Sequence, residues 1–220
     1  MTDSNFSPFP DRVPLWKIAA VSLGAIAWVA LLNAYRWALP SQFGLTPNDI
    51  CTDEAVLSSY LSTGGDPNAR VPIRNSGVRV SLLECTLFRG NKGMMRLLID
   101  HGADLELRSK VLNRLQRGGT ILHQAVIKED PAAAILLLQA GADVNADFDY
   151  LLGCAFCSGT HDITALHLAA STGQVAMIEL LLNAGADPNV VDGDGDTPLA
   201  VAEKYRHREA VAYFEFRSNQ

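Results

Sequence analysis

The sequence repeats two short phrases, and this repetition limits the folds open to the chain. One phrase is rich in glycine, aspartate and asparagine; the other joins a hydroxyl residue to leucine and small residues. Repeats at such intervals are typical of stacked units that bury their apolar faces only against their neighbours, so about three or more are needed for a stable core. The first phrase reads TGGDPNA from Thr63, HGADLEL from His101, AGADVNA from Ala140 and AGADPNV from Ala184; the second reads SLLECTLFRGN from Ser81, TILHQAVIKED from Thr120, TALHLAASTGQ from Thr164 and TPLAVAEKYRH from Thr197.

These phrases resemble the two signatures of the ankyrin repeat, T-P-L-H-x-A-A-x-x-G and L-L-x-x-G-A-D-x-N. The resemblance extends from Thr46 to Phe216. It implies an all-α ankyrin-repeat solenoid, built from helix–turn–helix units with projecting finger loops. We assign the repeat domain to residues 51–216, with an N-terminal cap, three full repeats and a C-terminal cap, and residues 217–220 to a tail.

Individual positions in the phrases predict how each unit is held together. Thr164 is expected to start a helix by hydrogen-bonding its first turn, and small alanines would let paired helices approach closely. His123 and His167 would bridge neighbouring repeats through their ring nitrogens. Leu180–Leu182 would form the buried face of a second helix, which Gly185 would end in the left-handed conformation.

The spacing of the repeats points to enlarged finger loops. The second phrase begins at residues 81, 120, 164 and 197, so its spacings are 39, 44 and 33 residues. The usual period is about 33 residues, and the first two junctions therefore carry insertions. A further long segment, residues 70–80, precedes Ser81. Loops on a rigid scaffold commonly carry binding function, although drift in a tolerant loop would give the same pattern.

Charge divides the repeats into a basic part and an acidic part. Residues 70–128 contain 11 Lys or Arg and four acidic residues, whereas residues 129–203 contain 12 acidic residues and no Lys or Arg. Such a field can orient a protein partner and speed its approach; solvation of the surface is the simpler explanation. The predicted partner-binding residues lie in the fingers: Arg70, Arg74, Arg79, Arg108, Lys110, Arg114, Arg117, Asp147, Asp149 and Tyr150.

The segment before the repeats predicts a single transmembrane helix. Residues 1–12 form a polar tail, which we expect to be disordered, and the 23 residues from Val13 to Tyr35 carry one charge near one end, at Lys17. A bilayer core of about 30 Å needs about 20 helical residues, and the aromatic residues at both ends suit its interfaces. We assign residues 13–39 to the span and 40–50 to a linker. A buried soluble helix and a cleaved signal peptide are the alternatives.

The charges beside this span favour one orientation. Arg12 and Lys17 precede it, only Arg36 follows closely, and the next basic residue is Arg70. By the positive-inside rule the N-terminus is cytoplasmic. The prediction is a single-pass protein of the bacterial inner membrane with its repeats in the periplasm.

The four cysteines predict two disulfide bonds if that compartment is oxidising. Cys154 and Cys157 would close a small loop in the longest finger, and Cys51 and Cys85 would join the N-terminal cap to the next repeat. In the cytoplasm all four would be thiols. A zinc site at Cys154 and Cys157 would lack a fourth ligand at a suitable spacing.

No catalytic, cofactor or metal site is expected. Asp192, Asp194, Asp196 and Glu203 follow the spacing of a calcium loop, but Thr197 stands where that loop requires glycine. The histidines are scattered, and no catalytic arrangement has the required context. A net charge of −6 argues against a nucleic-acid partner.

The function expected from these features is protein binding at a membrane surface by a chain that is monomeric on its own. The resemblance extends to membrane-anchored bacterial ankyrin proteins, which implies an immunity-type protein that neutralises a secreted toxin. An accessory protein for a periplasmic enzyme such as catalase is the alternative. A third is an adaptor or regulator on the cytoplasmic face.

Overall fold

The computed structural model describes residues 51–72, 79–108, 119–150 and 160–218. All of them belong to one unit that comprises residues 45–220. The predicted tail, transmembrane segment and linker, residues 1–50, lie outside the described residues. Within the described residues, no helix has both the length and the apolar character needed to cross a bilayer.

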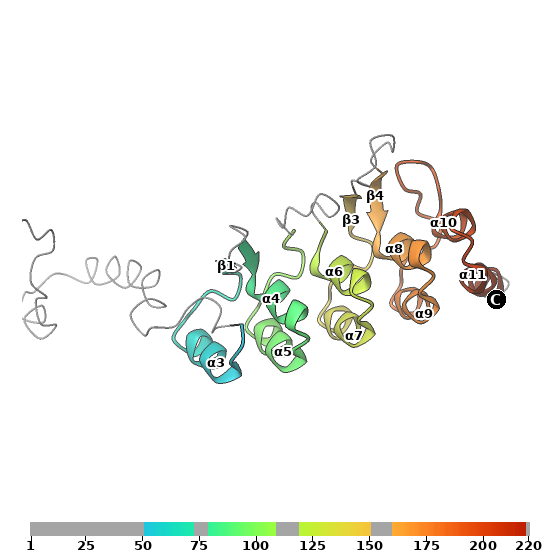
Figure 1. The fold of residues 1–220 in the computed structure, drawn as a ribbon. Helices are drawn as coiled ribbons and strands as arrows, with labels where there is room; N and C mark the ends of the chain where they lie inside the picture. Colours follow the sequence, from blue (N-terminus) through green and yellow to red (C-terminus); the bar gives the residue numbers. More distant parts are fainter. Residues whose placement is uncertain (1–50, 73–78, 109–118, 151–159, 219–220) are drawn as a thin grey trace, which may run out of the picture. The chain divides into compact units, whose positions relative to one another are not determined.

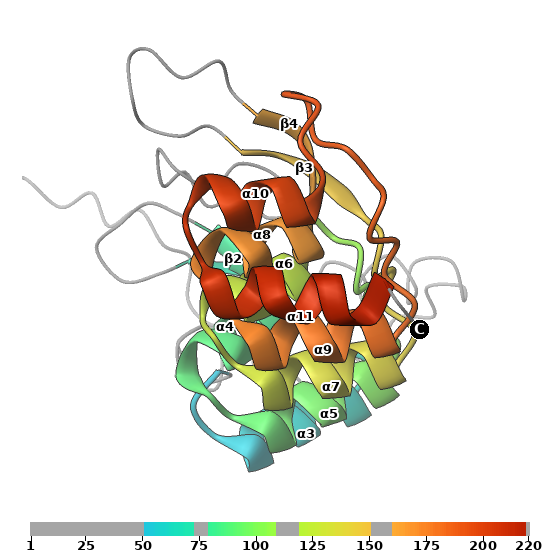
Figure 2. The same ribbon diagram turned by 90° about the vertical axis from the view of Figure 1, so that its right-hand side faces the viewer.

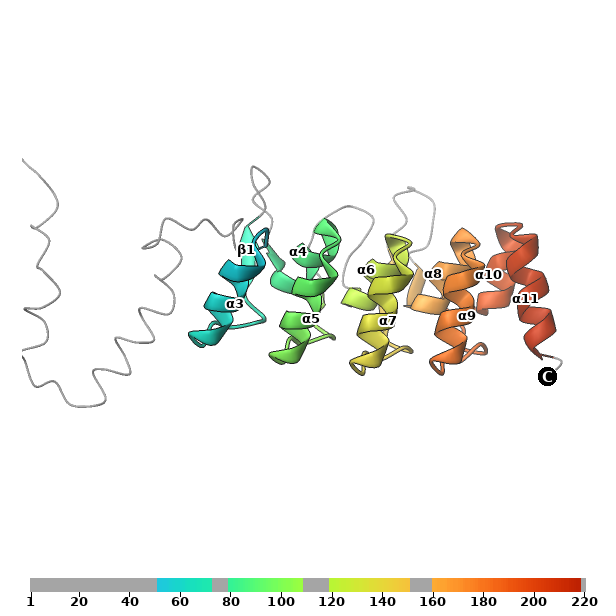
Figure 3. The same cartoon turned by 90° about the horizontal axis from the view of Figure 1, so that it is seen from below.

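The described part of the chain consists mainly of short helices that follow one another in antiparallel pairs (Figure 1). The pairs are stacked in the order of the sequence, as Figure 3 shows from below. The elements are α3 (Glu54–Ser62), β1 (Arg70–Pro72), β2 (Arg79–Ser81), α4 (Leu82–Arg89), α5 (Lys92–Asp100), α6 (Ile121–Ile127), α7 (Pro131–Gln139), β3 (Asp147–Tyr150), β4 (Thr160–Thr164), α8 (Ala165–Thr172), α9 (Val175–Asn183), α10 (Pro198–Lys204) and α11 (Arg208–Ser218).

Two fingers contain β-hairpins, so the prediction of an all-α fold was wrong in this detail. Strand β1 pairs antiparallel with β2, and β3 pairs antiparallel with β4. Opposed apolar residues, Val71 with Val80 and Phe148 with Ile163, are buried at the base of each hairpin. These two fingers therefore extend as paired strands, which satisfies backbone groups that an open loop would leave to water.

The helices form two layers, as Figure 2 shows along the stack. Helices α4, α6, α8 and α10 lie in the layer next to the fingers, and α3, α5, α7, α9 and α11 form the other. Ala169 and Ala170 of α8 are completely buried, in agreement with the prediction that small residues allow close approach. Of the three consecutive leucines in α9 only Leu181 is fully buried, whereas Leu180 and Leu182 are half-buried.

The threonine that starts α8 forms a capping box with the histidine three residues later, in agreement with the prediction that it bonds the first turn. The Nδ1 of His167 accepts hydrogen bonds from the backbone N–H of Thr164 at 3.2 Å and from its hydroxyl at 2.9 Å. Because Nδ1 is an acceptor, the neutral ring carries its proton on Nε2. That nitrogen donates to the carbonyl of Asp196 in the next repeat at 3.2 Å, which confirms the predicted bridge for His167.

His123 occupies the equivalent position but bridges its neighbour in a different way. Its Nδ1 again accepts from the threonine that starts the helix, Thr120, at 3.1 Å from the backbone nitrogen. Its Nε2 makes no hydrogen bond of normal geometry within the described residues, although the backbone carbonyls of Ala146 and Ile163 face the ring closely enough to favour its protonated form. The ring instead packs edge-on against Phe148 of the next finger, with centroids 4.5 Å apart. An aromatic contact therefore joins His123 to the next finger, in addition to the nearby backbone carbonyls.

Turns between repeats are joined by a ladder of side-chain hydrogen bonds. In each rung, a side-chain oxygen of one repeat accepts from the backbone N–H of an aspartate in the next, and all three rungs measure 2.7–2.9 Å. This ladder satisfies backbone donors at the stacked turns, which fixes the rise from one repeat to the next. The acceptor and donor pairs are Asn68 with Asp104, Glu106 with Asp143, and Asn145 with Asp187.

Two left-handed glycines provide a test of this packing. Gly173 and Gly185 have φ values of 71° and 94°, and Gly185 confirms the predicted helix end. A Cβ on Gly173 would lie 2.5 Å from Nδ1 of His207, whereas a Cβ on Gly185 would point into open space. His207 is held in place because its Nε2 donates to the carbonyl of Ser171 at 2.9 Å.

We therefore expect Gly173→Ala to lower the free energy of unfolding by about 2 kcal/mol and Gly185→Ala by about 1 kcal/mol. Both variants are strained in the left-handed region, but only the first also displaces His207. Urea unfolding followed by circular dichroism gives both values. Equal losses would show that His207 moves aside at no cost.

Candidate partner-binding surface

The ten predicted partner-binding residues fall into three groups in the structure. Four have described side chains: Arg70, Arg79, Arg108 and Asp147. Two lie in β3 with only their backbone described: Asp149 and Tyr150. Four lie outside the described residues: Arg74, Lys110, Arg114 and Arg117.

Three of these residues connect successive fingers. Nη2 of Arg70 donates to the backbone carbonyl of Arg108 at 3.0 Å, and Nη2 of Arg108 pairs with Oδ1 of Asp147 at 3.1 Å. Arg108 and Asp147 side chains are 55% and 53% exposed, so water weakens their attraction to about 0.2–1 kcal/mol. These contacts hold the fingers in register, which is a positioning role that the sequence did not indicate.

Arg79 is the predicted contact residue that the structure leaves most available. It lies on β2 opposite Pro72, and its side chain is exposed. Because Arg70 and Arg108 are engaged between fingers, Arg79 is the described arginine best placed to meet a partner. The arrangement favours a contact surface on the finger side of the first hairpin.

Because the repeats stack in sequence order, the basic and acidic segments of the sequence follow one another along the stack and form a charge gradient. The basic segment lies in the repeats of α4 and α5, and the acidic segment follows through α7, α8 and α9 to the start of α10 (Figure 3). Arg108 and Asp147 meet at the boundary between the two. A partner that contacts several fingers would therefore experience positive and negative potential in a fixed order.

The clustered aspartates before α10 have a local structural role. Oδ1 of Asp192 accepts from the backbone N–H groups of Asp194 and Asp196, both at 3.0 Å. Nζ of Lys204 pairs with Asp196 at 2.6 Å and with Asp194 at 3.8 Å, and the hydrogen bond with Asp196 raises the pKa of Lys204. One carboxylate oxygen each of Asp192, Asp194 and Asp196 lies within 4.8 Å of the others, a spacing that could hold a cation. The ammonium group of Lys204 balances part of this negative charge.

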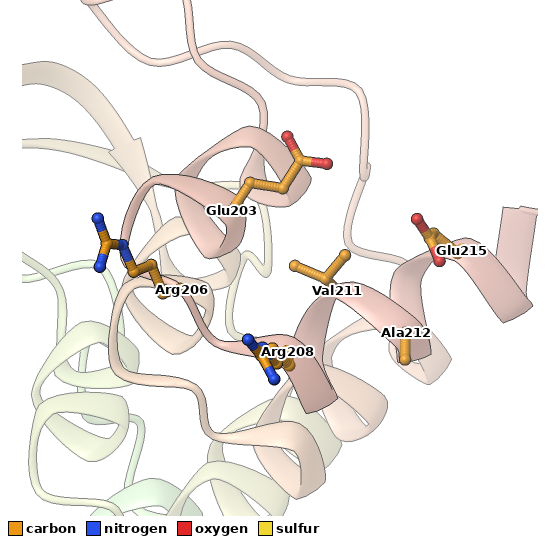
Figure 4. A pocket seen from close by; sticks show the side chains of 6 residues that line it. All are labelled: Glu203, Arg206, Arg208, Val211, Ala212 and Glu215. Atoms are coloured by element: carbon orange, nitrogen blue, oxygen red, sulfur yellow. The ribbon is translucent and has the colours of Figure 1, made fainter.

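A shallow hollow of about 380 Å³ lies where α10 meets α11. Figure 4 shows its lining, in which the carboxylates of Glu203 and Glu215 come from different helices and lie apart. The remaining lining residues are Arg206, Arg208, Val211 and Ala212.

The structure brings two of the four cysteines together as thiols. Cys51, just before α3, is buried, and Cys85, within α4, is half-buried. The interaction between their side chains lowers the pKa of Cys85 to about 7 and raises that of Cys51. The predicted proximity is present, but the predicted covalent bond is not. Cys154 and Cys157 lie outside the described residues.

The sequence did not predict a further contact, which joins the C-terminal ends of α4 and α6. Nζ of Lys128 donates to the carbonyl of Phe88 at 3.0 Å and lies 5.3 Å from the centroid of its ring. The contact joins two repeats beside an aromatic ring that is 43% exposed. Phe88 and Lys128 occupy adjacent positions of the second phrase, which was the available signal.

Comparison with known families matches the repeat region. A family model described as ankyrin repeats in three copies matches residues 147–215, and a single ankyrin repeat matches residues 117–147. The putative ankyrin repeat protein FPV223 of fowlpox virus is 31% identical over 144 residues, which cover 56% of this chain and 99% of the viral protein.

Longer relatives share only part of their length with this chain. The mouse ankyrin repeat and SOCS box protein 16 is 31% identical over 170 residues, which are 74% of this chain but 34% of the relative. The fruit-fly ARF GTPase-activating protein Git is 37% identical over 86 residues, or 39% of this chain and 10% of the relative. The similarity thus covers the repeats and not the whole of either relative.

Proposed function

The chain belongs to the ankyrin-repeat family, and from this premise we propose that it binds a protein partner across its fingers without catalysing a reaction. Ankyrin repeats are protein-interaction modules. The observation that carries the proposal for this chain is the ordered charge gradient along a stack whose fingers are held in register. A rigid surface of this kind gives up little conformational entropy when it binds.

The proposal includes a membrane tether that sets the compartment of the repeats. The apolar run within residues 13–39 and the basic residues before it support a span with a cytoplasmic N-terminus. On this proposal the repeats face the periplasm of a bacterium, where the Cys51 and Cys85 thiols would become a disulfide. The partner would be a secreted toxin, which the protein neutralises as an immunity-type protein.

The first experiment determines on which side of the membrane the repeats lie. The result distinguishes a periplasmic protein from an adaptor on the cytoplasmic face. A C-terminal fusion to alkaline phosphatase, which folds to an active enzyme only outside the cytoplasm, is expected to be active. A matched fusion to green fluorescent protein exported by the same route is expected to be dark. A fluorescent fusion without phosphatase activity would place the repeats in the cytoplasm and overturn the periplasmic part.

Binding is then tested with the proteins encoded beside this gene. An immunity-type role requires a near-stoichiometric complex that abolishes the toxicity of one of them, measured by calorimetric titration and by survival of cells that express both. Weak binding that raises the activity of a neighbouring enzyme would instead support the accessory role.

Charge reversal at the first finger is expected to slow association. For Arg74→Glu with Arg79→Glu, we expect the association rate with the partner to fall about tenfold at low salt, and the difference to shrink as salt screens the field. Stopped-flow fluorescence measures the rates. Arg96→Glu is the matched control, since Arg96 is exposed on α5 in the other layer. Equal effects of the two changes would contradict binding through the finger.

A further inference from the structure

The layer of helices away from the fingers carries one exposed row of side chains, which we call the outer row. It is formed by the fifth residue of each helix in this layer, and all of these residues are exposed. Because the helices lie side by side in sequence order, their fifth residues follow one another across the stack (Figure 3). In chain order the outer row consists of Ser58, Arg96, Ile135, Glu179 and Ala212.

The central helix of the row, α7, is apolar on its outward side. Its sequence contains no charged residue, and Ala132 and Ile135 are exposed opposite the buried Ala133, Ala134 and Leu137. The Ile135 side chain is 43% exposed. A surface helix normally turns polar residues to water, and a helix that is apolar on every side is normally covered. The outward side of α7 therefore has the composition of a contact surface.

Opposite charges flank this apolar centre. Arg96 on α5 and Glu179 on α9 are exposed, and neither forms an ion pair within the described part of the chain. Each lies one helix away from Ile135, or about 10 Å, because packed helices are separated by roughly that distance. The ends of the row, Ser58 and Ala212, are uncharged. The row therefore runs from a positive to a negative charge through an apolar midpoint.

Such a row is complementary to a second copy of itself. A two-fold axis that runs parallel to α7 between two copies reverses the order of the helices but keeps their direction and height. Ile135 then meets Ile135 of the second copy, and Arg96 meets its Glu179 on both sides. Ser58 meets Ala212, so no like charges in the row oppose each other. A two-fold axis along the stack would instead place Arg96 against Arg96.

We propose that the outer row is a homodimer interface, in which α7 packs against α7 of a second copy about an axis parallel to that helix. The charges identify the occupant as a second copy. The apolar run within residues 13–39 would cover Ile135, but it contains no acidic residue to pair with Arg96. This inference goes beyond the proposed function and replaces the expectation that the chain is monomeric on its own.

The dimer would leave the fingers uncovered, because they lie beside the other layer of helices (Figure 2). Each dimer would therefore display two copies of the candidate partner-binding surface, which allows bivalent binding. The contact involves α5, α7 and α9 of each copy and little else, so it belongs with the small interfaces of weak, reversible complexes. Association is expected in the micromolar range.

The first test is the oligomeric state of the full-length chain at low salt. Sedimentation equilibrium in a detergent matched to the density of the buffer gives the dissociation constant of the dimer. Ile135→Glu brings two carboxylates together at the centre and is expected to raise this constant about tenfold or more. Val191→Glu is the matched control, because Val191 is 51% exposed in the turn before α10, away from the row. Equal effects of the two changes would overturn the proposal.

Charge reversal tests the direction of the two-fold axis. Arg96→Glu alone or Glu179→Arg alone opposes like charges at two places in the dimer, and each should raise the dissociation constant about tenfold at low salt. The two changes in one chain exchange the charges and should restore the constant to within about threefold. A mixture of the two single variants also restores every attractive pair. Copies that carry different affinity tags should then purify together, whereas each single variant alone should not.

Two further results would overturn the proposal. One is a wild-type chain that stays monomeric up to about 100 μM, which is above the range expected for a functional contact. The other is a dimer whose dissociation constant is the same in Ile135→Glu and in the single charge reversals, because the copies would then associate through another part of the chain. Circular dichroism checks that each variant keeps its helices. No partner protein is present in these measurements, so their failure would leave the proposed binding at the fingers untouched.

Discussion

Replacing Leu181 with alanine is expected to lower the free energy of unfolding by about 3–4 kcal/mol. The Leu181 side chain is completely buried in α9. It lies on the same helical stripe as Met177 and Ile178, so truncation leaves a cavity lined by close-packed neighbours. In a repeat stack such a cavity weakens two interfaces at once. Urea unfolding monitored by circular dichroism measures the change.

The two flanking leucines provide controls of the same size and chemistry. Leu180 and Leu182 are half-buried, because each lies about 100° around the helix from Leu181. We expect Leu180→Ala and Leu182→Ala to cost about 1 kcal/mol each. Three equal losses would contradict the placement of the buried stripe.

Acidification is expected to destabilise the repeats through His123. Burial is the main reason that the pKa of His123 falls to about 4, and the nearby carbonyls of Ala146 and Ile163 offset only part of the effect. Protonation would also remove the acceptor that Nδ1 offers to Thr120. Burial lowers the pKa of His167 as well.

The sign of the effect follows from which state binds the proton. Between pH 6.5 and about 4 the unfolded chain is protonated at residue 123 and the folded chain is not, so stability falls as the pH falls through this window. We expect His123 to account for a loss of about 2–3 kcal/mol between pH 7 and pH 4.

Denaturant unfolding across this pH range tests the assignment. His123→Asn retains an acceptor for the backbone N–H of Thr120 but does not titrate. It should be less stable than the wild type at pH 7 and should show a shallower decline on acidification. An unchanged slope in the variant would assign the pH dependence to other groups.

The two β-hairpins could not be predicted from the sequence. The spacing of the second phrase located the enlarged fingers, but the pairing of β1 with β2 and of β3 with β4 depends on residues that meet only after the chain turns back. The strands are short, and their alternation is too brief to separate from an irregular loop. For the same reason the aromatic contact of His123 with Phe148 could not be predicted.

The candidate surface was predicted as a set of residue types, and the structure changed the roles of several members. Arg70, Arg108 and Asp147 were expected to contact a partner, yet they also bind one another across successive fingers. Arg79 lies exposed on β2, and its contact with a partner stays a prediction. Such differences between similar arginines arise from the stacking of repeats.

The sequence alone determined the repeat family, the order of the units, the helix starts and the division of charge. These features depend on contacts within a turn or two of the chain, and the same local phrase produces the same local structure each time. Only the tertiary structure decided which leucine of α9 is buried, which arginines hold the fingers and that His123 packs against Phe148. Those outcomes depend on side chains brought together by stacking, at distances that no local phrase encodes.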